Sequence, residues 1–222
     1  ILGLTMDYGP YGFMDAYDPR FICNHSDTQG RYAFANQPAV ALWNLRALAL
    51  ALSDLIDTDT LVEKLDTFEE HFSAAYRAHM RAKLGLTRDD SGDDGLIGDL
   101  LALMAKARAD YSLTFLKLPD EDGNWLKLFG ALGDDAKVWL ARWHARTRGE
   151  DLSGMAQVNP RYVLRNWVAE TAIRAVQGHD DIATLDRIFN LVRAPFEKQD
   201  GGEAFAAPPP PSMCDLEVSC SS

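Results

Sequence analysis

The residues best suited to chemistry lie at the start of the chain, in Asp7-Tyr8-Gly9 and the Gly- and aromatic-rich run that extends it to Phe13. A carboxylate directly before a Gly can hold a divalent cation against nucleotide phosphates, while the Gly lets the backbone turn behind it. An Asp in an ordinary turn before a Gly is the alternative, and it needs no ligand. Asp7 is therefore the first candidate for a metal ligand.

Five more charged or titratable side chains crowd the same part of the chain: Asp15, Asp18, His25, Asp27 and Arg31. Several carboxylates near a metal site could recruit a second ion, or Arg31 could pair with one of them. Local hydrogen bonding is the alternative for each residue. Residues 1–36 as a whole have no helical period, which predicts a long, irregular, packed loop of the kind that carries function.

Longer motifs surround the tripeptide, which itself has the form of the Asp-Phe-Gly element that holds Mg²⁺ in protein kinases. It lies in Thr5–Pro19 (TMDYGPYGFMDAYDP), which is followed by Phe21–Asp27 (FICNHSD), Gln29–Tyr32 (QGRY) and Asn36–Pro38 (NQP). The chain also closes on Leu216–Ser222 (LEVSCSS). With these motifs in order at both ends, the sequence resembles the selenoprotein O family, protein-kinase-like enzymes that transfer AMP from ATP to protein hydroxyls.

The resemblance implies roles for several residues. Asp7 falls on the family's metal-binding Asp, which binds Mg²⁺ (with Mn²⁺ as a possible substitute) and contacts ATP. The loop as far as Arg31 corresponds to the activation segment, which receives protein substrates with hydroxyl side chains. The resemblance covers only about the last half of a family member, so the catalytic Asp and the Gly-rich phosphate loop are expected upstream of residue 1. We therefore expect this chain alone to be inactive.

Two other functions stay open from the residues. An ordinary kinase-like phosphotransferase would move the γ-phosphate, and nothing within the chain separates it from an adenylyltransferase. A catalytically silent helical interaction module is the third possibility. The concentration of Asp, Gly and aromatic residues in 7–34 speaks against this module.

Cysteine supplies a second candidate chemistry. In the family that the sequence resembles, some members carry selenocysteine at the position of Cys220, and Cys23 lies in the activation-segment-like loop. A Cys23–Cys220 disulfide would hold the tail across that loop and would need a thiol reductant protein to open it. The alternative is a buried Cys23 and an idle Cys220. Cys214 matches nothing in the family.

Composition narrows the class of protein. The net charge of −11 argues against a general nucleic-acid binder, whose affinity would rest on neutralising phosphates. No apolar run reaches the roughly 18 to 20 residues of a membrane span, because polar residues interrupt the longest candidate, 39–56. Three cysteines and a start without a basic leader indicate a reducing, cytoplasmic location. The Ala-, Asp- and Arg-rich composition suggests a bacterial source, and the missing initiator Met suggests a fragment.

Helical periodicity dominates beyond residue 36. Helices are predicted at 39–56, 61–84, 96–109, 134–146, 160–177 and 181–192. The leucines of the first helix (Leu42, Leu45, Leu48, Leu52 and Leu55) share one face and are predicted to be core. Thr60 and Glu63 form a capping box, Gly85 caps the second helix, and Asn159 caps the fifth. The five tryptophans are predicted to anchor packing, and 89–95 is read as an acidic loop without calcium spacing.

These patterns predict a mainly α protein, and the resemblance makes it the C-terminal part of a protein-kinase-like fold. We divide the chain into a metal-binding and activation-segment-like loop (1–36), a helical body (37–199) and a Pro-rich extended tail (200–222). The tail contains the Pro208–Pro211 run and the C-terminal Cys motif.

Overall fold

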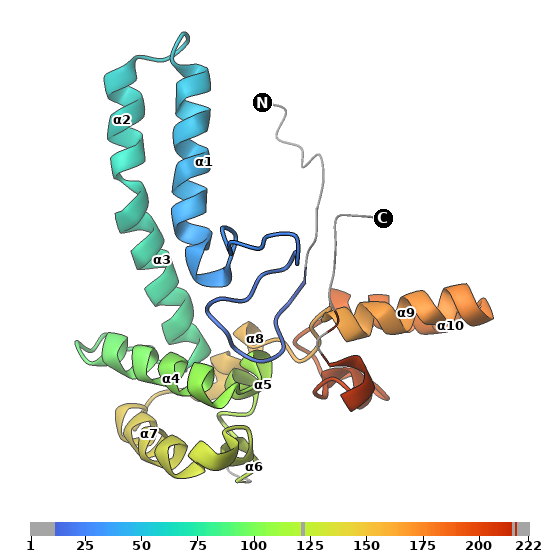
Figure 1. The fold of residues 1–222 in the computed structure, drawn as a ribbon. Helices are drawn as coiled ribbons and strands as arrows, with labels where there is room; N and C mark the ends of the chain where they lie inside the picture. The colour runs from blue at the N-terminus through green and yellow to red at the C-terminus, as the bar shows by residue number, and fades with distance from the viewer. Residues whose placement is uncertain (1–11, 121–122, 215, 217–222) are drawn as a thin grey trace.

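The computed structural model describes residues 12–120, 123–214 and 216. This part of the chain is mainly α, as predicted (Figure 1). Its strand-like pairing consists of two isolated bridges, Phe13 with Arg165 and Ala16 with Asp110. None of the helices in the described ranges is long and apolar enough to cross a membrane.

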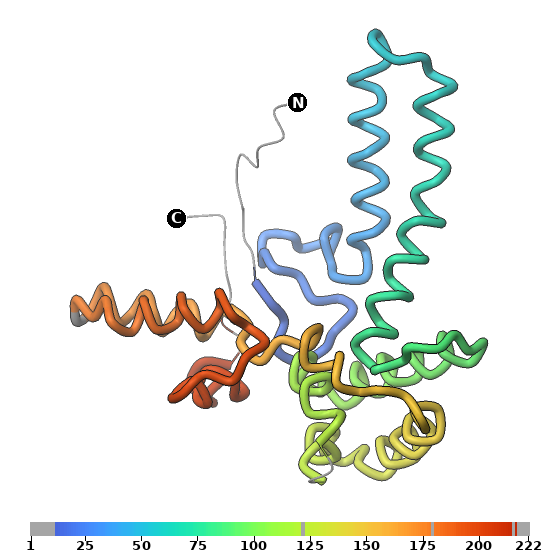
Figure 2. The backbone as a smooth tube through the Cα atoms, turned by 180° about the vertical axis from the view of Figure 1, so that it is seen from behind, coloured from blue at the N-terminus to red at the C-terminus, as the bar shows by residue number. Residues whose placement is uncertain are grey.

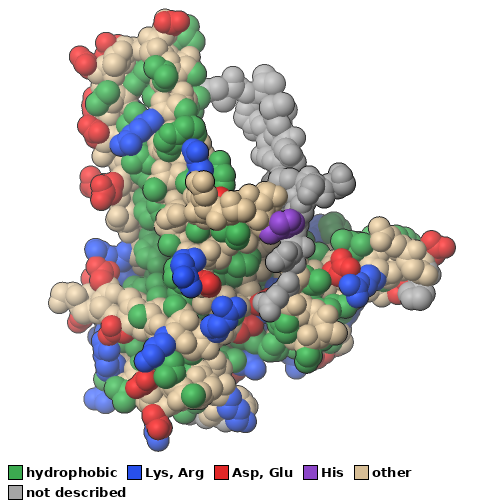
Figure 3. Space-filling model, in the orientation of Figure 1, with side chains coloured by type: hydrophobic (Ala, Val, Ile, Leu, Met, Phe, Trp, Pro, Cys, Tyr) green, Lys and Arg blue, Asp and Glu red, His purple; other side chains and the backbone are tan. Residues whose placement is uncertain are grey.

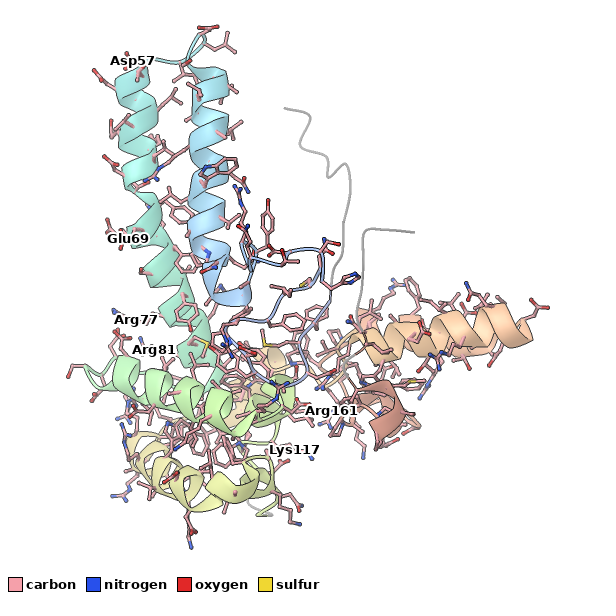
Figure 4. All side chains as sticks on the ribbon, in the orientation of Figure 1. Asp57, Glu69, Arg77, Arg81, Lys117 and Arg161 are labelled. Atoms are coloured by element: carbon pink, nitrogen blue, oxygen red, sulfur yellow. The ribbon has the colours of Figure 1, made fainter. Side chains whose placement is uncertain are left out.

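A long helical hairpin projects from the rest of the molecule (Figure 1). One arm is α1 (Gln37–Leu52), and the other consists of α2 (Thr58–Asp66) followed by α3 (Phe68–Lys83). Asp57, at the tip of the hairpin (Figure 4), accepts a hydrogen bond from Thr60 N at 3.1 Å. Asp57 is therefore the N-cap of α2, and the capping box predicted at Thr60 is wrong because the better cap lies three residues earlier.

The second arm is two helices and not the single helix predicted from its periodicity. The break falls at Thr67, whose hydroxyl donates to Lys64 O at 2.8 Å. A Thr side chain that bonds the preceding turn competes with the backbone for its carbonyls, which weakens the helix at that point. The predicted end is confirmed: Leu84 caps α3, and Gly85 follows in the left-handed region with φ of 69°.

The leucine stripe of α1 is not core, which corrects the prediction. No residue of α1 is buried, and Leu55 in the loop beyond it is 81% exposed. Within the described chain α1 contacts the other arm of the hairpin and the loop residues at its foot, which leave none of its side chains buried. Its periodicity therefore correctly predicts a helix but not a core position. Hydrophobic side chains are accordingly visible along the hairpin in Figure 3. Trp43 on α1, predicted as an anchor, is 54% exposed.

Five helices form the body at the base of the hairpin (Figures 1 and 2). They are α4 (Asp93–Ala107), α5 (Tyr111–Leu116), α6 (Asn124–Lys127), α7 (Gly133–Arg146) and α8 (Met155–Val158). The predicted anchors Trp125, Trp139 and Trp143 are buried here. Each indole N–H donates to a backbone carbonyl, for example Trp143 Nε1 to Leu84 O at 2.9 Å. The helices predicted at 96–109 and 134–146 are confirmed within three residues at each boundary.

The acidic loop before α4 ends in a buried ion-pair network. Asp93 is almost fully buried and accepts from Arg146 Nε at 2.7 Å, while Arg81 Nε lies 3.1 Å away. The hydrogen bond to Asp93, then that to Glu150, raises the pKa of Arg146 above its ordinary value although burial opposes this. Arg81 lies near the base of the hairpin (Figure 4), so the network ties α3 to α4 and α7.

The last two helices, α9 (Asn166–His179) and α10 (Ile182–Arg193), form a separate helical pair. Asp181 caps α10 by accepting from Thr184 N at 3.1 Å, so the predicted helix 181–192 is confirmed. Beyond α10, two short 3-10 turns, Glu203–Ala206 and Pro211–Met213, interrupt the predicted extended tail. Phe205, Met213 and Leu216 pack against a small core that includes Trp167 on α9. The described part of the tail therefore lies against α9 and α10.

The helix predicted at 160–177 starts too early. Asn159 is buried and donates its amide to Lys83 O at 2.9 Å, so its side chain is not a cap. The chain then runs non-helically, with Arg161 N donating to Pro195 O at 2.7 Å, and α9 begins only at Asn166. The tertiary bonds of this segment outweigh the local Asn-Pro start signal.

Candidate functional site

Asp7 lies outside the described residues, so the site is built here from Gly12 onward. The described part of the predicted loop, residues 12–36, lies between the foot of α1, the start of α5 and the start of α9 (Figure 2). Tyr17 N donates to Ala109 O at 2.8 Å, and Tyr111 N donates to Asp15 O at 2.9 Å. These two bonds make a short antiparallel pairing that fixes the loop to the N-terminus of α5.

Arg165 joins the loop to two helix starts. Its guanidinium donates from Nη1 to Asp15 Oδ1 at 2.9 Å and to Asp110 Oδ2 at 2.6 Å, and from Nη2 to Asp110 Oδ1 at 2.9 Å. The side chain of Arg165 is 4% exposed, against 11% for Asp110 and 29% for Asp15. Burial alone would lower the pKa of Arg165, but the hydrogen bonds and charges of the two carboxylates raise it.

Asp110 serves two elements at once. The carboxylate that receives Arg165 also accepts from Leu113 N at 2.8 Å, so it is the N-cap of α5. Its backbone pairs with Ala16 of the loop. The loop, α5 and α9 therefore share one polar junction.

Asn166, the first residue of α9, contacts both the loop and the tail. A Cβ at Gly12 would lie 2.5 Å from Asn166 Oδ1, so the loop backbone passes close to this amide and a larger residue there would require the amide to move. On its other side, Asn166 Nδ2 donates to Leu216 O at 3.0 Å. The start of the described loop and the end of the described tail thus meet at one side chain.

An aromatic cluster packs beneath the loop. The rings of Tyr17 and Tyr111 stack at 5.6 Å, and Phe34 lies edge-on to Tyr17 at 6.0 Å. Burial raises the pKa of Tyr111 to about 12, with smaller contributions from Tyr76 and Tyr17. Burial likewise raises the pKa of Tyr17. The loop is therefore anchored by an apolar contact as well as by ion pairs.

A half-buried lysine completes this layer. Lys83 Nζ lies 4.9 Å from the ring centroid of Phe115 and donates to Asn159 Oδ1 at 3.2 Å. Burial lowers the pKa of Lys83. The ammonium has ring faces and one amide oxygen around it, which ties the end of α3 to α5.

The outer part of the loop is braced by its own carboxylate. Asp27 accepts backbone hydrogen bonds from Arg31 N at 3.0 Å and Tyr32 N at 2.8 Å. The Arg31 guanidinium lies 4.7 Å from the ring centroid of Trp43. The Arg31 side chain thus contacts a ring of α1, and an ion pair between Arg31 and a loop carboxylate, which was one of the two alternatives, is absent from the ion pairs of the described residues. The bonds to Asp27 are the local hydrogen bonding that was the other alternative.

The cysteines are only partly placed. Cys23 Sγ donates to Gly12 O at 3.5 Å and is half-buried as a free thiol. Cys214 is exposed and free. Cys220 lies outside the described residues.

The described part of the loop offers little to a metal ion. Among the described residues, no three His, Cys, Asp or Glu side chains gather as a metal site. Asp15 is engaged by Arg165, Asp18 accepts from Arg20 N at 2.8 Å, and Asp27 accepts from the backbone. A metal site here therefore depends on Asp7 and on ligands outside the described chain.

Arg165 and Asp110 were not predicted from the sequence. Asp110 could have been found as an N-cap before α5, since Asp precedes a run of apolar residues there. Arg165 lies within a stretch predicted as helix interior and has no local signal. Its partner Asp15 is 150 residues away.

The comparisons with known proteins agree with these motifs. The family model for protein adenylyltransferase SelO matches residues 1–193. Over 232 residues the chain is 47% identical to the protein nucleotidyltransferase YdiU of Bordetella avium (strain 197N), a match that covers 100% of this chain and 47% of that relative. The chain therefore spans about half the length of this curated relative.

Proposed function

We propose, from the premise that this chain belongs to the protein adenylyltransferase SelO family, that it is the C-terminal part of an enzyme that transfers AMP from ATP to Ser, Thr or Tyr hydroxyls of proteins. The observation that carries the proposal is the family match, which includes Asp7-Tyr8-Gly9 and runs through the loop and most of the helical body. The name of the Bordetella avium relative describes the same general activity, nucleotidyl transfer.

In this proposal Asp7 is the residue that holds the cation and contacts ATP. Mg²⁺, or Mn²⁺ in its place, would supply charge neutralisation on the phosphates when bound. The other carboxylates of the described loop are engaged elsewhere, so Asp7 is the ligand that this chain contributes. The catalytic Asp and the phosphate-binding loop belong to the half of the family's length that this chain does not span.

The loop from Gly12 to Asn36 would shape access for the acceptor protein. Its ends are held by Asp15 and by the 3-10 turn Phe34–Asn36, while its outer part carries the exposed Tyr32. An exposed segment held at both ends can present a surface without losing much conformational entropy on binding.

Cys23 and Cys220 would regulate the site through a disulfide. The Cys23 thiol bonds to Gly12, Gly12 packs on Asn166, and Asn166 bonds to Leu216 O. Cys220 is four residues beyond Leu216, and four residues span at most roughly 14 Å. The bridge would close by exchange with a disulfide oxidant, which takes up the two electrons and both protons as a dithiol, and a thiol reductant protein would reopen it by the reverse exchange in the cytoplasm, where we place the enzyme.

Radiolabelled ATP tests the activity. The chain, preceded by the upstream half of a family member, is incubated with Mg²⁺ and ATP labelled at the α or the γ phosphate, beside an Asp7→Ala variant. We expect protein-bound α label that Asp7→Ala abolishes, and no label from the 222-residue chain alone. Bound γ label without α label would instead indicate a phosphotransferase. No transfer and no nucleotide binding would leave a silent helical interaction module.

Peptide mapping without reductant tests the cysteine pair. After exposure to an oxidised dithiol, we expect a Cys23–Cys220 peptide and an unlinked Cys214. A Cys214-containing bridge, or three free thiols, would contradict the regulatory role.

A further inference from the structure

Arg165 is the point at which three distant segments of the chain meet. It bonds Asp15 of the loop and the cap residue Asp110 of α5, and it is itself the N-cap residue of α9. The backbone of Phe13 pairs with that of Arg165, and Ala16 pairs with Asp110. Side-chain and backbone contacts thus fix the same five residues of the loop, 13–17.

The geometry requires an arginine. Two parallel bonds to Asp110 use both terminal nitrogens, and Nη1 is shared with Asp15. A lysine ammonium has no planar fork and cannot reproduce this paired contact. Because the guanidinium is 4% exposed, water cannot replace a lost carboxylate at little cost.

We propose that Arg165 is a positioning residue for the transfer reaction, because it sets the path of loop residues 13–17 and so the placement of the segment that receives the acceptor. The inference deepens the proposed function and rests on it. Arg165 touches neither nucleotide nor acceptor in this role. It acts through Asp15 and the loop backbone.

Variants can separate positioning from folding. Asp15→Ala removes only the loop side of the junction and leaves both bonds between Arg165 and Asp110, so the fold of α5 and α9 should persist. Arg165→Lys keeps the charge without the fork. Arg174→Met is the matched control, since Arg174 lies on the same helix in an exposed pair with Glu170.

The first readout is amide hydrogen exchange in the 222-residue chain. The reporters are Tyr17 N–H and Tyr111 N–H, which flank the junction, with Thr147 N–H at the C-terminal end of α7 as the internal reference. We expect the reporters to exchange about tenfold faster in Asp15→Ala, which corresponds to about 1.4 kcal/mol. The exchange rate of Thr147 N–H should not change, and the reporters in Arg174→Met should exchange at the wild-type rate.

The second readout is AMP transfer by the chain preceded by the upstream half of a family member. We expect Asp15→Ala to lower kcat by about tenfold with KM for ATP unchanged, as for loss of a correctly placed reacting geometry. Arg165→Lys should recover part of the rate that Arg165→Met loses. If Arg165 had a purely structural role, the two variants would differ in their thermal transitions but not in kcat.

The two readouts distinguish the possible failures. Unchanged exchange at Tyr17 and Tyr111 in Asp15→Ala overturns the positioning role directly. Faster exchange with unchanged kcat also overturns it, because the loop would then be held without consequence for transfer. A wild-type enzyme that transfers no AMP overturns the proposed function and, with it, the role of Arg165 in transfer.

Discussion

Alkaline pH gives a quantitative test of the aromatic layer beneath the loop. The change is Tyr111→Phe, which removes one hydroxyl and keeps the ring that stacks on Tyr17. Burial raises the pKa of Tyr111 from 10.0 to about 12, so the folded protein holds this proton at pH values where the unfolded chain has lost it. The stability that depends on the proton is complete below pH 10 and is lost as the pH rises toward 12.

The size of the effect follows from the two pKa values. At pH 11 the unfolded chain gains about 1.4 kcal/mol relative to the folded protein through this one group, and about 2.7 kcal/mol once the pH exceeds 12. Tyr17 has a raised pKa as well and adds to the loss. Lys83 has the opposite sign, because its folded pKa is lowered and its contribution rises until about pH 10.5.

The assay is urea unfolding followed by far-ultraviolet circular dichroism at pH 9, 10, 10.5, 11 and 11.5. Relative to the wild type, Tyr111→Phe should retain about 1.4 kcal/mol more of its free energy of unfolding between pH 9 and 11. Below pH 9 the free energies of unfolding of the two proteins should change equally with pH. Equal losses for both proteins above pH 10 would refute the desolvation of Tyr111 and the packing inferred from it.

Three further predictions concern the packing around the site. Gly202→Ala places a Cβ 2.5 Å from Tyr162 Oη and 2.9 Å from Leu191 Cδ2, so thermal unfolding should show a loss of about 1–3 kcal/mol in the free energy of unfolding. The control is Gly98→Ala, where a Cβ would have no atom within 4 Å and the protein should lose no stability. Similar losses of stability in both variants would contradict the clash at Gly202. Asp57→Ala should cost about 1 kcal/mol of stability in urea unfolding, whereas an effect no larger than that of Asp54→Ala would mean that Asp57 is not an effective cap. Lys83→Met should abolish the gain in unfolding free energy that the wild type shows as the pH rises toward 10.5, and a persistent gain would assign it to another group.

The elements that the sequence predicts well have their signals within a few residues. Asp181, the first residue of the predicted helix 181–192, precedes an amphipathic stretch and caps α10. Gly85 follows α3 in the left-handed conformation that its position requires. In both cases a side chain or backbone conformation decides the boundary without help from distant residues.

Predictions failed where distant contacts decide the outcome. Asn159-Pro160 has the local form of a helix start, but Asn159 bonds Lys83, which is 76 residues away. The leucines of α1 have a helical period, but periodicity does not state what covers a helix, and no residue of α1 is buried in the described chain. Burial depends on neighbours that no local pattern contains.

The candidate site likewise has a part that the sequence predicts and a part that only the structure shows. Its motif, Asp7-Tyr8-Gly9, was recognisable from the sequence, but it lies outside the described residues and its role stays a prediction. Cys220 and the division of the chain into a loop, a body and a tail also stay predictions. The junction of Arg165, Asp110 and Asp15 could be found only from the structure, since ion pairs between segments this far apart have no periodic signature.

The separation of 150 residues between Asp15 and Arg165 also has a consequence for biosynthesis. The loop leaves the ribosome first, and its ion-pair partner is made later by roughly 8 to 30 s at 5 to 20 residues per second. For the first part of that interval the loop lacks both the start of α5 and Arg165. For the rest of it the start of α5 has been made, but Arg165 has not. Loop residues 13–17 should therefore be among the last parts of the described chain to take their final shape, after the start of α9 has been synthesised.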